Sequence, residues 1–237
     1  MRFIIRLLWK CLPKRERFFL LERFPVHERQ AINKVLSGNN KIVSGFEQNN
    51  CIFIHVPKCA GESVCKSLFG KGPGHLPLTW YERTSPDLYE RAFKFTFVRD
   101  PLERAYSAYR YLKNDRGIER DAHARSVVEQ YADFDAFVKG WLCPENVLKQ
   151  MHFAPQWLLL CNSAGHIAVD FIGRQERMAE DFACVCQKLG VCVDLAQVNR
   201  SLRTEKSARE MCSDEALRII ADVYRRDYAL LGYPLPI

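Results

Sequence analysis

The chain has 237 residues, of which 48% are hydrophobic and 27% are charged. This is enough for one α/β domain with extensions and a proper hydrophobic core, so it excludes the small domains that depend on disulfides. The net charge of +7 favours anionic ligands such as nucleotides, nucleic acid, acidic glycans or anionic membrane, without choosing among them.

Ten cysteines are spread along the chain. Cys184 and Cys186 are separated by one residue, and no second pair stands at the spacing of zinc ligands. Disulfide frameworks belong mainly to small secreted domains. We therefore expect mostly reduced thiols, a reducing compartment and no metal site.

Residues 1–45 are predicted to be an N-terminal extension, possibly helical. Arg2, Arg6 and Lys10 interrupt its apolar runs, so no stretch approaches the roughly 20 residues of a membrane span. A signal-peptide pattern is also missing. Basic residues beside Trp9 and apolar residues are typical of a helix that lies on anionic lipid, which predicts possible peripheral membrane contact. A helix packed on the domain, or a frayed end, is the alternative.

Residues 46–237 show strands alternating with helices, which predicts an α/β fold with a mostly parallel sheet. In chain order we expect strands at 51–56, 93–98 and 167–172, and helices at 62–69, from 101, at 126–141 with a break near Asp133, at 177–189 and at 213–231. Ligands of such sheets bind beyond the carboxyl ends of the strands.

The first candidate site is the segment from His55 to Ser63, where a strand leads through a tight loop into a helix. This arrangement directs backbone N–H groups and the positive end of a helix at a phosphate. Lys58 adds a charge, Ser63 a hydroxyl, and Gly61 permits a close backbone approach. The Walker pattern is absent because the lysine precedes the glycine. An ordinary strand, turn and helix with a surface lysine is the alternative.

The second candidate site is the segment from Phe97 to Ser107. Arg99 follows a strand, and Ser107 lies eight positions later on the next helix. A guanidinium fork and a hydroxyl together suit a phosphate. The alternative is a structural arginine that pairs with Asp100 or Glu103.

Together these two segments resemble the donor-binding motifs of sulfotransferases that use PAPS (3′-phosphoadenosine 5′-phosphosulfate), above all the carbohydrate sulfotransferases, the group containing heparan sulfate 2-O-sulfotransferase and bacterial relatives. The resemblance covers roughly residues 50–235 and implies a P-loop-like three-layer α/β/α fold. It implies that the 5′-phosphosulfate is held by Lys58, Cys59, Ala60, Gly61, Glu62 and Ser63. It implies that Arg99 and Ser107 hold the 3′-phosphate. Glu62 departs from the family, in which small or hydroxylated residues are common there.

Later segments agree with this resemblance. Residues 171–176 are similar to the family's third strand, and residues 224–233 to its last helix. Arg200 and Ser201 lie in a segment that resembles a late loop near the nucleotide.

His75 stands in a Gly-His pair between the two motifs, where the family's proposed general base lies. The acceptor hydroxyl must lose a proton as it attacks sulfur, and imidazole titrates near working pH. The resemblance therefore implies catalytic roles for Lys58 and His75. The competing candidate for the base is a carboxylate such as Glu82, and a loop histidine without a role is the alternative. Gln156 matches a glutamine of similar relatives. It either lines the cleft or has a packing role.

Asp133 and Asp135 form a D-x-D pair, which is a metal site in many glycosyltransferases. Apolar residues follow at helical spacing, so we interpret Asp133 as a helix N-cap and expect no metal.

The resemblance predicts an enzyme that transfers a sulfuryl group from PAPS to a hydroxyl, with a carbohydrate acceptor (polysaccharide or glycolipid) and no nucleic-acid partner. The family's animal members are anchored in the Golgi, and residues 1–45 show no such anchor, so we expect a cytoplasmic enzyme that is possibly membrane-associated. A nucleotide kinase and a noncatalytic protein that binds anionic glycans are the alternatives.

Overall fold

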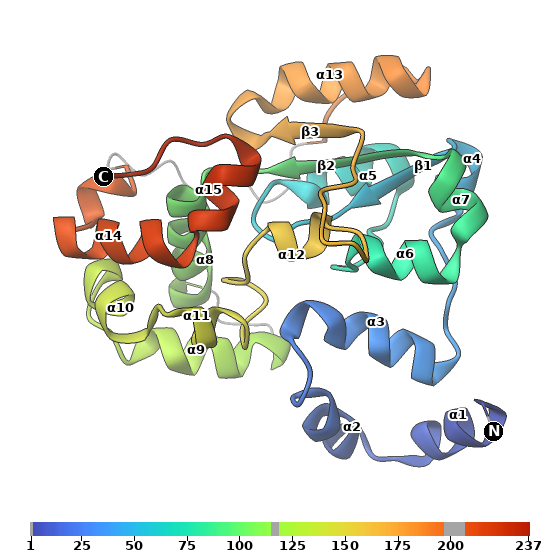
Figure 1. Ribbon diagram of the computed structural model, residues 1–237, viewed down its shortest axis with the longest axis horizontal. Helices are drawn as coiled ribbons and strands as arrows, with labels where there is room; N and C mark the ends of the chain where they lie inside the picture. Colours follow the sequence, from blue (N-terminus) through green and yellow to red (C-terminus); the bar gives the residue numbers. More distant parts are fainter. Residues whose placement is uncertain (1, 115–118, 197–206) are drawn as a thin grey trace.

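The structure, a computed structural model, describes residues 2–114, 119–196 and 207–237. Its fold is α/β, as the sequence predicts, with a three-stranded sheet in the order β1-β2-β3 within these residues. In Figure 1 α13 (Met178–Leu189) runs alongside β3, while α6 (Leu78–Thr84) and α12 (Trp157–Leu160) lie on the opposite side of the strands.

The sheet brings the carboxyl ends of its strands to one edge. All pairings are parallel: β1 (Cys51–Ile54) pairs with β2 (Phe93–Val98), and β2 pairs with β3 (Phe171–Arg174). Ile54 lies opposite Thr96, and the last residues of β2 and β3 lie opposite each other. The segments that follow β1 and β2, which carry the two candidate motifs, therefore leave the sheet side by side.

The third strand begins later than the sequence predicts. The expected strand at 167–172 is wrong in its bounds because Ile167 forms only an isolated antiparallel bridge with Cys161. Gly165, at φ +81°, turns the chain between the two. The Asp170 carboxylate then accepts a hydrogen bond from the backbone N–H of Lys94 at 2.7 Å, and the strand starts one residue later.

Most predicted helices are present, and one is divided. The predicted closing helix at 213–231 is two helices, because Tyr224 leaves the helical conformation at φ −105° and ψ 19°. The other helices of the described residues are α1 Arg2–Cys11, α2 Lys14–Leu21, α3 Val26–Ser37, α4 Ser44–Gln48, α5 Gly61–Phe69, α7 Pro86–Arg91, α8 Pro101–Asn114, α9 Ala122–Glu129, α10 Phe134–Trp141 and α11 Pro144–Val147, and the divided pair is α14 Asp214–Val223 and α15 Arg225–Leu231.

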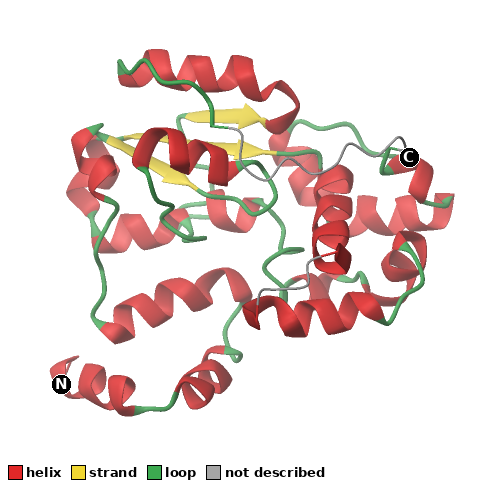
Figure 2. Ribbon diagram, turned by 180° about the vertical axis from the view of Figure 1, so that it is seen from behind, coloured by secondary structure: helices red, strands yellow, loops and turns green. Residues whose placement is uncertain are grey.

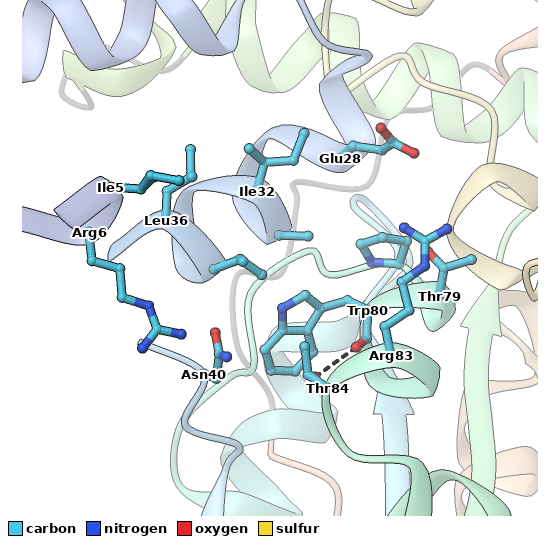
Figure 3. Close-up of a pocket in the computed structure, with 13 residues that line it drawn as sticks. Ile5, Arg6, Glu28, Ile32, Leu36, Asn40, Thr79, Trp80, Arg83 and Thr84 are labelled. Atoms are coloured by element: carbon cyan, nitrogen blue, oxygen red, sulfur yellow. Dashed lines mark hydrogen bonds between the residues drawn. The ribbon is translucent and has the colours of Figure 1, made fainter. Parts of the chain in front are cut away.

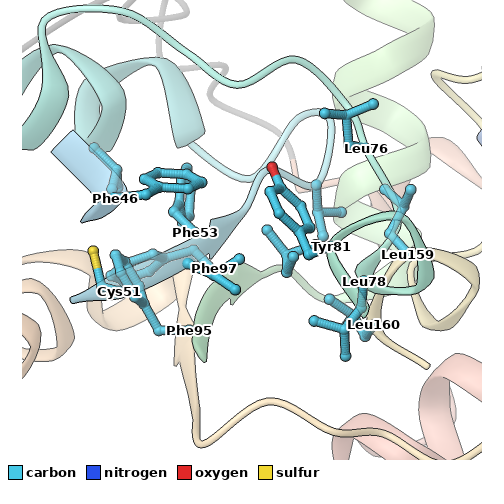
Figure 4. Packing of buried hydrophobic residues seen from close by; sticks show 14 of the residues in the cluster. Phe46, Cys51, Phe53, Leu76, Leu78, Tyr81, Phe95, Phe97, Leu159 and Leu160 are labelled. Carbon is cyan, nitrogen blue, oxygen red and sulfur yellow. The ribbon is translucent and has the colours of Figure 1, made fainter. Parts of the chain in front are cut away.

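Two apolar clusters hold these elements together. The first surrounds the sheet, where the rings of Phe53 and Phe95 stack at 5.1 Å and Phe46 of α4 packs beside Tyr81 of α6 (Figure 4). The second joins α8, α9, α10, α14 and α15 around Phe137. The described part of the chain therefore packs around two apolar clusters.

The N-terminal helices form an outer layer. In Figures 1 and 2, α1 and α2 lie at the edge of the molecule, and α3 lies between them and the sheet. Ala31 of α3 belongs to the cluster around the sheet, and α4 spans the predicted boundary at residues 45 and 46. None of the helices in the described ranges combines the length and the apolar character that crossing a membrane requires.

Candidate functional site

The loop between β1 and α5 has an unusual backbone. Lys58 and Ala60 both have positive φ, 68° and 58°, which is rare for residues with a side chain. Such conformations cost about 1–3 kcal/mol each and are concentrated at functional sites. Ala60 also occupies the N-cap of α5 and provides no side-chain hydrogen bond to it. The loop therefore combines stored strain with a helix start whose N-cap residue provides no side-chain hydrogen bond.

The side chains of this loop differ in direction. Cys59 is buried, and its thiol lies 3.4 Å from Oε1 of Gln156, so only its backbone is available to a ligand. Burial raises the pKa of the Cys59 thiol to about 12. Ser63 is buried near the start of α5, whereas Glu62 is exposed.

A glycine is required at position 61 because the ring of a histidine packs against it. A Cβ at this position would lie 2.1 Å from Cδ2 of the His55 ring, so any other residue would displace it. His55 is buried, and burial, together with the nearby His75, lowers the pKa of its imidazole to about 3. His55 is therefore a neutral structural residue that fixes the path of the loop.

Arg99 lies directly after β2, at the sheet edge where the β1 loop also leaves. Its guanidinium contacts Glu103 at 3.3 Å, which is the pairing expected of a structural arginine. However, its Nε is buried and has no hydrogen-bond partner among the described residues. A buried N–H without a partner is unfavourable by about 1–3 kcal/mol, so a ligand oxygen would satisfy it.

Lys58 connects the two motifs. Its ammonium group lies 3.9 Å from the centre of the Tyr111 ring on α8, a cation–π contact. Ser107 is half-buried one helical turn before Tyr111, so both lie on the same face of α8. Lys58 therefore reaches the helix face that presents Ser107.

Tyr111 is itself held by a polar chain. Its hydroxyl donates to Oδ2 of Asp121 at 2.9 Å, and Nε2 of His152 lies 3.2 Å from the other oxygen of Asp121. Sequence reasoning gave Tyr111 and Asp121 no role, since neither belongs to a motif.

Gln156 clamps the two loops together. It is fully buried, its Oε1 accepts from the backbone N–H of Arg99 at 3.1 Å, and its Nε2 donates to the Arg99 carbonyl at 2.8 Å. The same Oε1 contacts the Cys59 thiol. The alternative in which Gln156 packs is therefore confirmed, and its packing fixes the relative position of both motifs.

Two buried charged residues, Asp227 and Arg104, support the position of Gln156. The Asp227 carboxylate accepts from the backbone N–H groups of Gln156 and Trp157, each at 2.8 Å. Burial raises the pKa of Asp227, and the nearby Arg104 opposes that shift. Arg104 is fully buried and donates to the carbonyls of His152 and Ala154.

His75 is held in one tautomer. Its Nδ1 lies 2.9 Å from the carbonyl oxygen of His55, which only accepts, so Nδ1 carries the hydrogen. In the neutral ring Nε2 is then the basic nitrogen. The backbone N–H of His75 donates to Oε1 of Gln30 on α3 at 2.7 Å, and a Cβ at Gly74 would meet Gln30 at 2.1 Å.

The remaining residues that the sequence singled out have other contacts or lie outside the described residues. The Glu82 carboxylate is engaged with Ser163, from which it accepts two hydrogen bonds at 2.9 Å. Asp133 caps α10 as predicted, accepting from the N–H of Ala136. Arg200 and Ser201 lie outside the described residues. Across the parts of the chain that the structure describes, no group of acidic, histidine and cysteine side chains is arranged to hold a metal.

One cavity lies beside the second motif, and another lies beside the N-terminal helices. One of about 500 Å³ is bounded by Arg174, Glu176, Arg177 and Tyr233, after β3. It adjoins the second motif because Glu176 accepts from the backbone N–H of Asp100 at 2.8 Å. The other, of about 680 Å³, separates the N-terminal helices from α6.

Comparison with known proteins identifies relatives. The chain is 24% identical to carbohydrate sulfotransferase 14 of Danio rerio over 165 residues, 61% of this chain and 44% of the relative. It is 25% identical to carbohydrate sulfotransferase 11 of Mus musculus over 236 residues, 80% of this chain and 66% of the relative. The chain thus spans between two fifths and two thirds of the length of these relatives. No solved structure matches it significantly.

A model of the sulfotransferase family matches residues 71–234, which include His75, Arg99 and Ser107. Both relatives carry the name carbohydrate sulfotransferase, whereas the likeness to heparan sulfate 2-O-sulfotransferase stays a prediction. Since the match covers well over half of the chain, this protein belongs to the sulfotransferase family.

Proposed function

We propose that this protein transfers a sulfuryl group from PAPS to a hydroxyl of a carbohydrate, using a P-loop-like three-layer fold. The observation that carries the proposal is the clamp of Gln156, which holds Cys59 of one motif and Arg99 of the other at one sheet edge. Family membership and the names of the two relatives support the same reaction.

The residues fit an anionic donor with two phosphate ends. The left-handed residues Lys58 and Ala60 lead into the N-terminus of α5, and a loop of this kind before a helix forms the backbone concavity that binds phosphate. We assign the 5′-phosphosulfate to this loop. We assign the 3′-phosphate to Arg99, whose buried Nε lacks a partner in the described part of the chain, and to Ser107.

His75 is proposed as the general base. Its Nδ1–H is held by the His55 carbonyl, so Nε2 is the atom that accepts the proton of the acceptor hydroxyl. The hydroxyl oxygen forms a bond to sulfur, the bond from sulfur to the 5′-phosphate oxygen breaks, and PAP (3′-phosphoadenosine 5′-phosphate) leaves. Lys58 stabilises the negative charge that develops on that phosphate oxygen.

The test is transfer itself. The protein is incubated with PAPS labelled in its sulfuryl group and a panel of polysaccharides and glycolipids, with and without EDTA. We expect label in at least one carbohydrate, unaffected by EDTA because the proposed roles use no metal. Absence of label from every carbohydrate, together with magnesium-dependent turnover of ATP in a parallel incubation, would replace the proposal by a phosphotransferase.

A further inference from the structure

The first helices expose an unusual amount of apolar surface. Among the described residues, thirteen large hydrophobic side chains are exposed, and seven of them lie between residues 4 and 24. These seven are Ile4, Ile5, Leu7, Leu8, Phe18, Phe19 and Phe24. A concentration of this kind marks a surface that binds another body, because isolated exposed apolar residues are scattered on ordinary surfaces.

Helix α1 turns its apolar stripe away from the protein. Ile4, Leu7, Leu8 and Cys11 follow the i, i+3, i+4, i+7 pattern of one helix face, and all four are exposed. Trp9 lies on the opposite face, where it is buried and donates from Nε1 to Asn33 of α3 at 3.1 Å. The helix is therefore oriented opposite to that of an ordinary surface helix.

The inner face of α1 already packs against α3. In Figure 3 Ile5, the one residue of the seven that turns toward α3, lies beside Leu36. Ile5 and Leu36 border a groove together with Ile32 of α3 and Trp80 of α6. Because α1 uses this face against the rest of the molecule, a rotation of the helix would not bury the outer stripe without exposing Trp9.

Helix α2 and the turn after it extend the apolar surface. Phe18 and Phe19 are 58% and 55% exposed, and Phe24 is 44% exposed. The guanidinium of Arg23 lies 5.2 Å from the centre of the Phe19 ring, so cationic and aromatic groups alternate here. Figure 1 shows α1 and α2 together as the outermost layer of the molecule.

The same segment carries much of the positive charge. Residues 4–24 contain six Lys or Arg and two Glu, a net charge of +4 out of +7 for the whole chain. A second copy of this surface would bring like charges together, which disfavours self-association. An anionic lipid surface complements both features, since it accepts apolar side chains at the headgroup boundary and attracts Lys and Arg.

We propose that α1 and α2 bind the surface of an anionic lipid bilayer. The side chains of Leu7, Leu8 and Phe19 enter the boundary of the acyl chains, and the basic side chains between them contact lipid phosphates. This inference goes beyond the proposed function and is independent of it, because vesicle binding requires neither PAPS nor an acceptor.

Vesicle co-sedimentation of the full chain tests the proposal. Vesicles of phosphatidylcholine alone are compared with vesicles that also contain phosphatidylglycerol. We expect binding to the anionic vesicles to be stronger by roughly tenfold or more, and to weaken as salt is raised. Equal binding to both vesicles at low salt, or none to either, would overturn the proposal.

Two double variants sharpen this test. Leu8→Glu with Phe19→Glu places carboxylates in the apolar surface and should abolish binding, whereas Val193→Glu with Leu235→Glu makes the same change at exposed apolar residues elsewhere. Circular dichroism checks that each variant is folded. If a variant does not fold, the dependence of wild-type binding on salt and lipid composition tests the proposal instead. Wild-type binding by the first variant, or a lipid-free dimer that only this variant loses, would assign the surface to something other than lipid.

Discussion

The sheet-edge site buries polar side chains, whereas the N-terminal helices expose apolar ones. At the site, Arg104, Gln156 and Asp227 are polar and fully buried. Asp227 accepts from the backbone of Gln156, and Gln156 in turn contacts the backbone of Arg99 and the thiol of Cys59. In α1 and α2, apolar side chains are exposed and lack such a network in the described residues. The first region is preorganised before any ligand arrives, whereas the second is complete only against another surface.

Helix α3 connects the two regions. Its Asn33 holds Trp9 of α1, and its Gln30 holds the backbone of His75. The predictions below test whether the first region depends on its internal contacts and the second does not.

The largest effect is expected from the proposed base. His75→Ala should lower turnover by about 10²–10⁴-fold while the affinity for PAP stays the same, because the base acts in the chemical step and not in donor binding. Single-turnover transfer at saturating PAPS measures this. A folded variant within a few-fold of the wild-type rate would remove His75 from the mechanism.

Arg104→Leu should destabilise the protein by about 3–5 kcal/mol, because it leaves the Asp227 carboxylate buried without its neighbouring charge and frees two carbonyls. Denaturant unfolding measures the change in the free energy of unfolding. Arg218→Leu, at an exposed arginine of α14, is the matched control and should have little effect. Equal stability of the two variants would mean that the buried network does not support the site.

Arg99→Ala should weaken PAP binding by about 1.5–3 kcal/mol, as expected for the loss of a hydrogen bond to a charged group. Calorimetry measures the affinity, with Lys66→Ala as a control that removes an exposed positive charge from α5. Unchanged binding by Arg99→Ala would reduce Arg99 to the structural partner of Glu103.

Gln30→Ala should lower turnover by roughly 2- to 12-fold, the equivalent of one hydrogen bond of about 0.5–1.5 kcal/mol, without changing PAP affinity. The effect arises because the His75 backbone loses its acceptor on α3. Gln30→Glu keeps an acceptor oxygen and should restore turnover. If both variants lost activity equally, the hydrogen bond to His75 would not be the cause.

The smallest effect is expected in α1. Leu8→Ala should change the free energy of unfolding by less than about 0.5 kcal/mol because the side chain is exposed. Leu112→Ala, at a fully buried leucine of α8, should cost about 2–5 kcal/mol in the same denaturation experiment. A comparable loss from both substitutions would show that the α1 stripe is buried against the protein.

Local patterns predicted most of the fold. The apolar run before His55, the Asp and Pro that begin α8, the N-cap at Asp133 and the glycine that ends α13 are all signals within a few residues of the element concerned. The break at Tyr224 has no glycine or proline to announce it. The start of β3 depends on a side-chain contact to β2, which a local pattern does not contain.

The sequence predicts the motifs of the candidate site, but not the contacts that hold these motifs in position. Lys58, Gly61, Arg99 and His75 stand in recognisable local contexts. Gln156 contacts Arg99 across 57 residues of sequence, and Gln30 contacts His75 across 45. Such pairs arise from the packing of distant helices and loops, so a single sequence offers no spacing from which to infer them.

We propose that this sheet edge binds a nucleotide with a 3′-phosphate, and calorimetry with PAP and AMP measures this preference. The two ligands differ only in that phosphate, which we assign to Arg99 and Ser107. We expect PAP to bind more tightly than AMP, and Arg99→Ala to remove much of the difference. Equal affinity of the wild-type protein for PAP and AMP would contradict it.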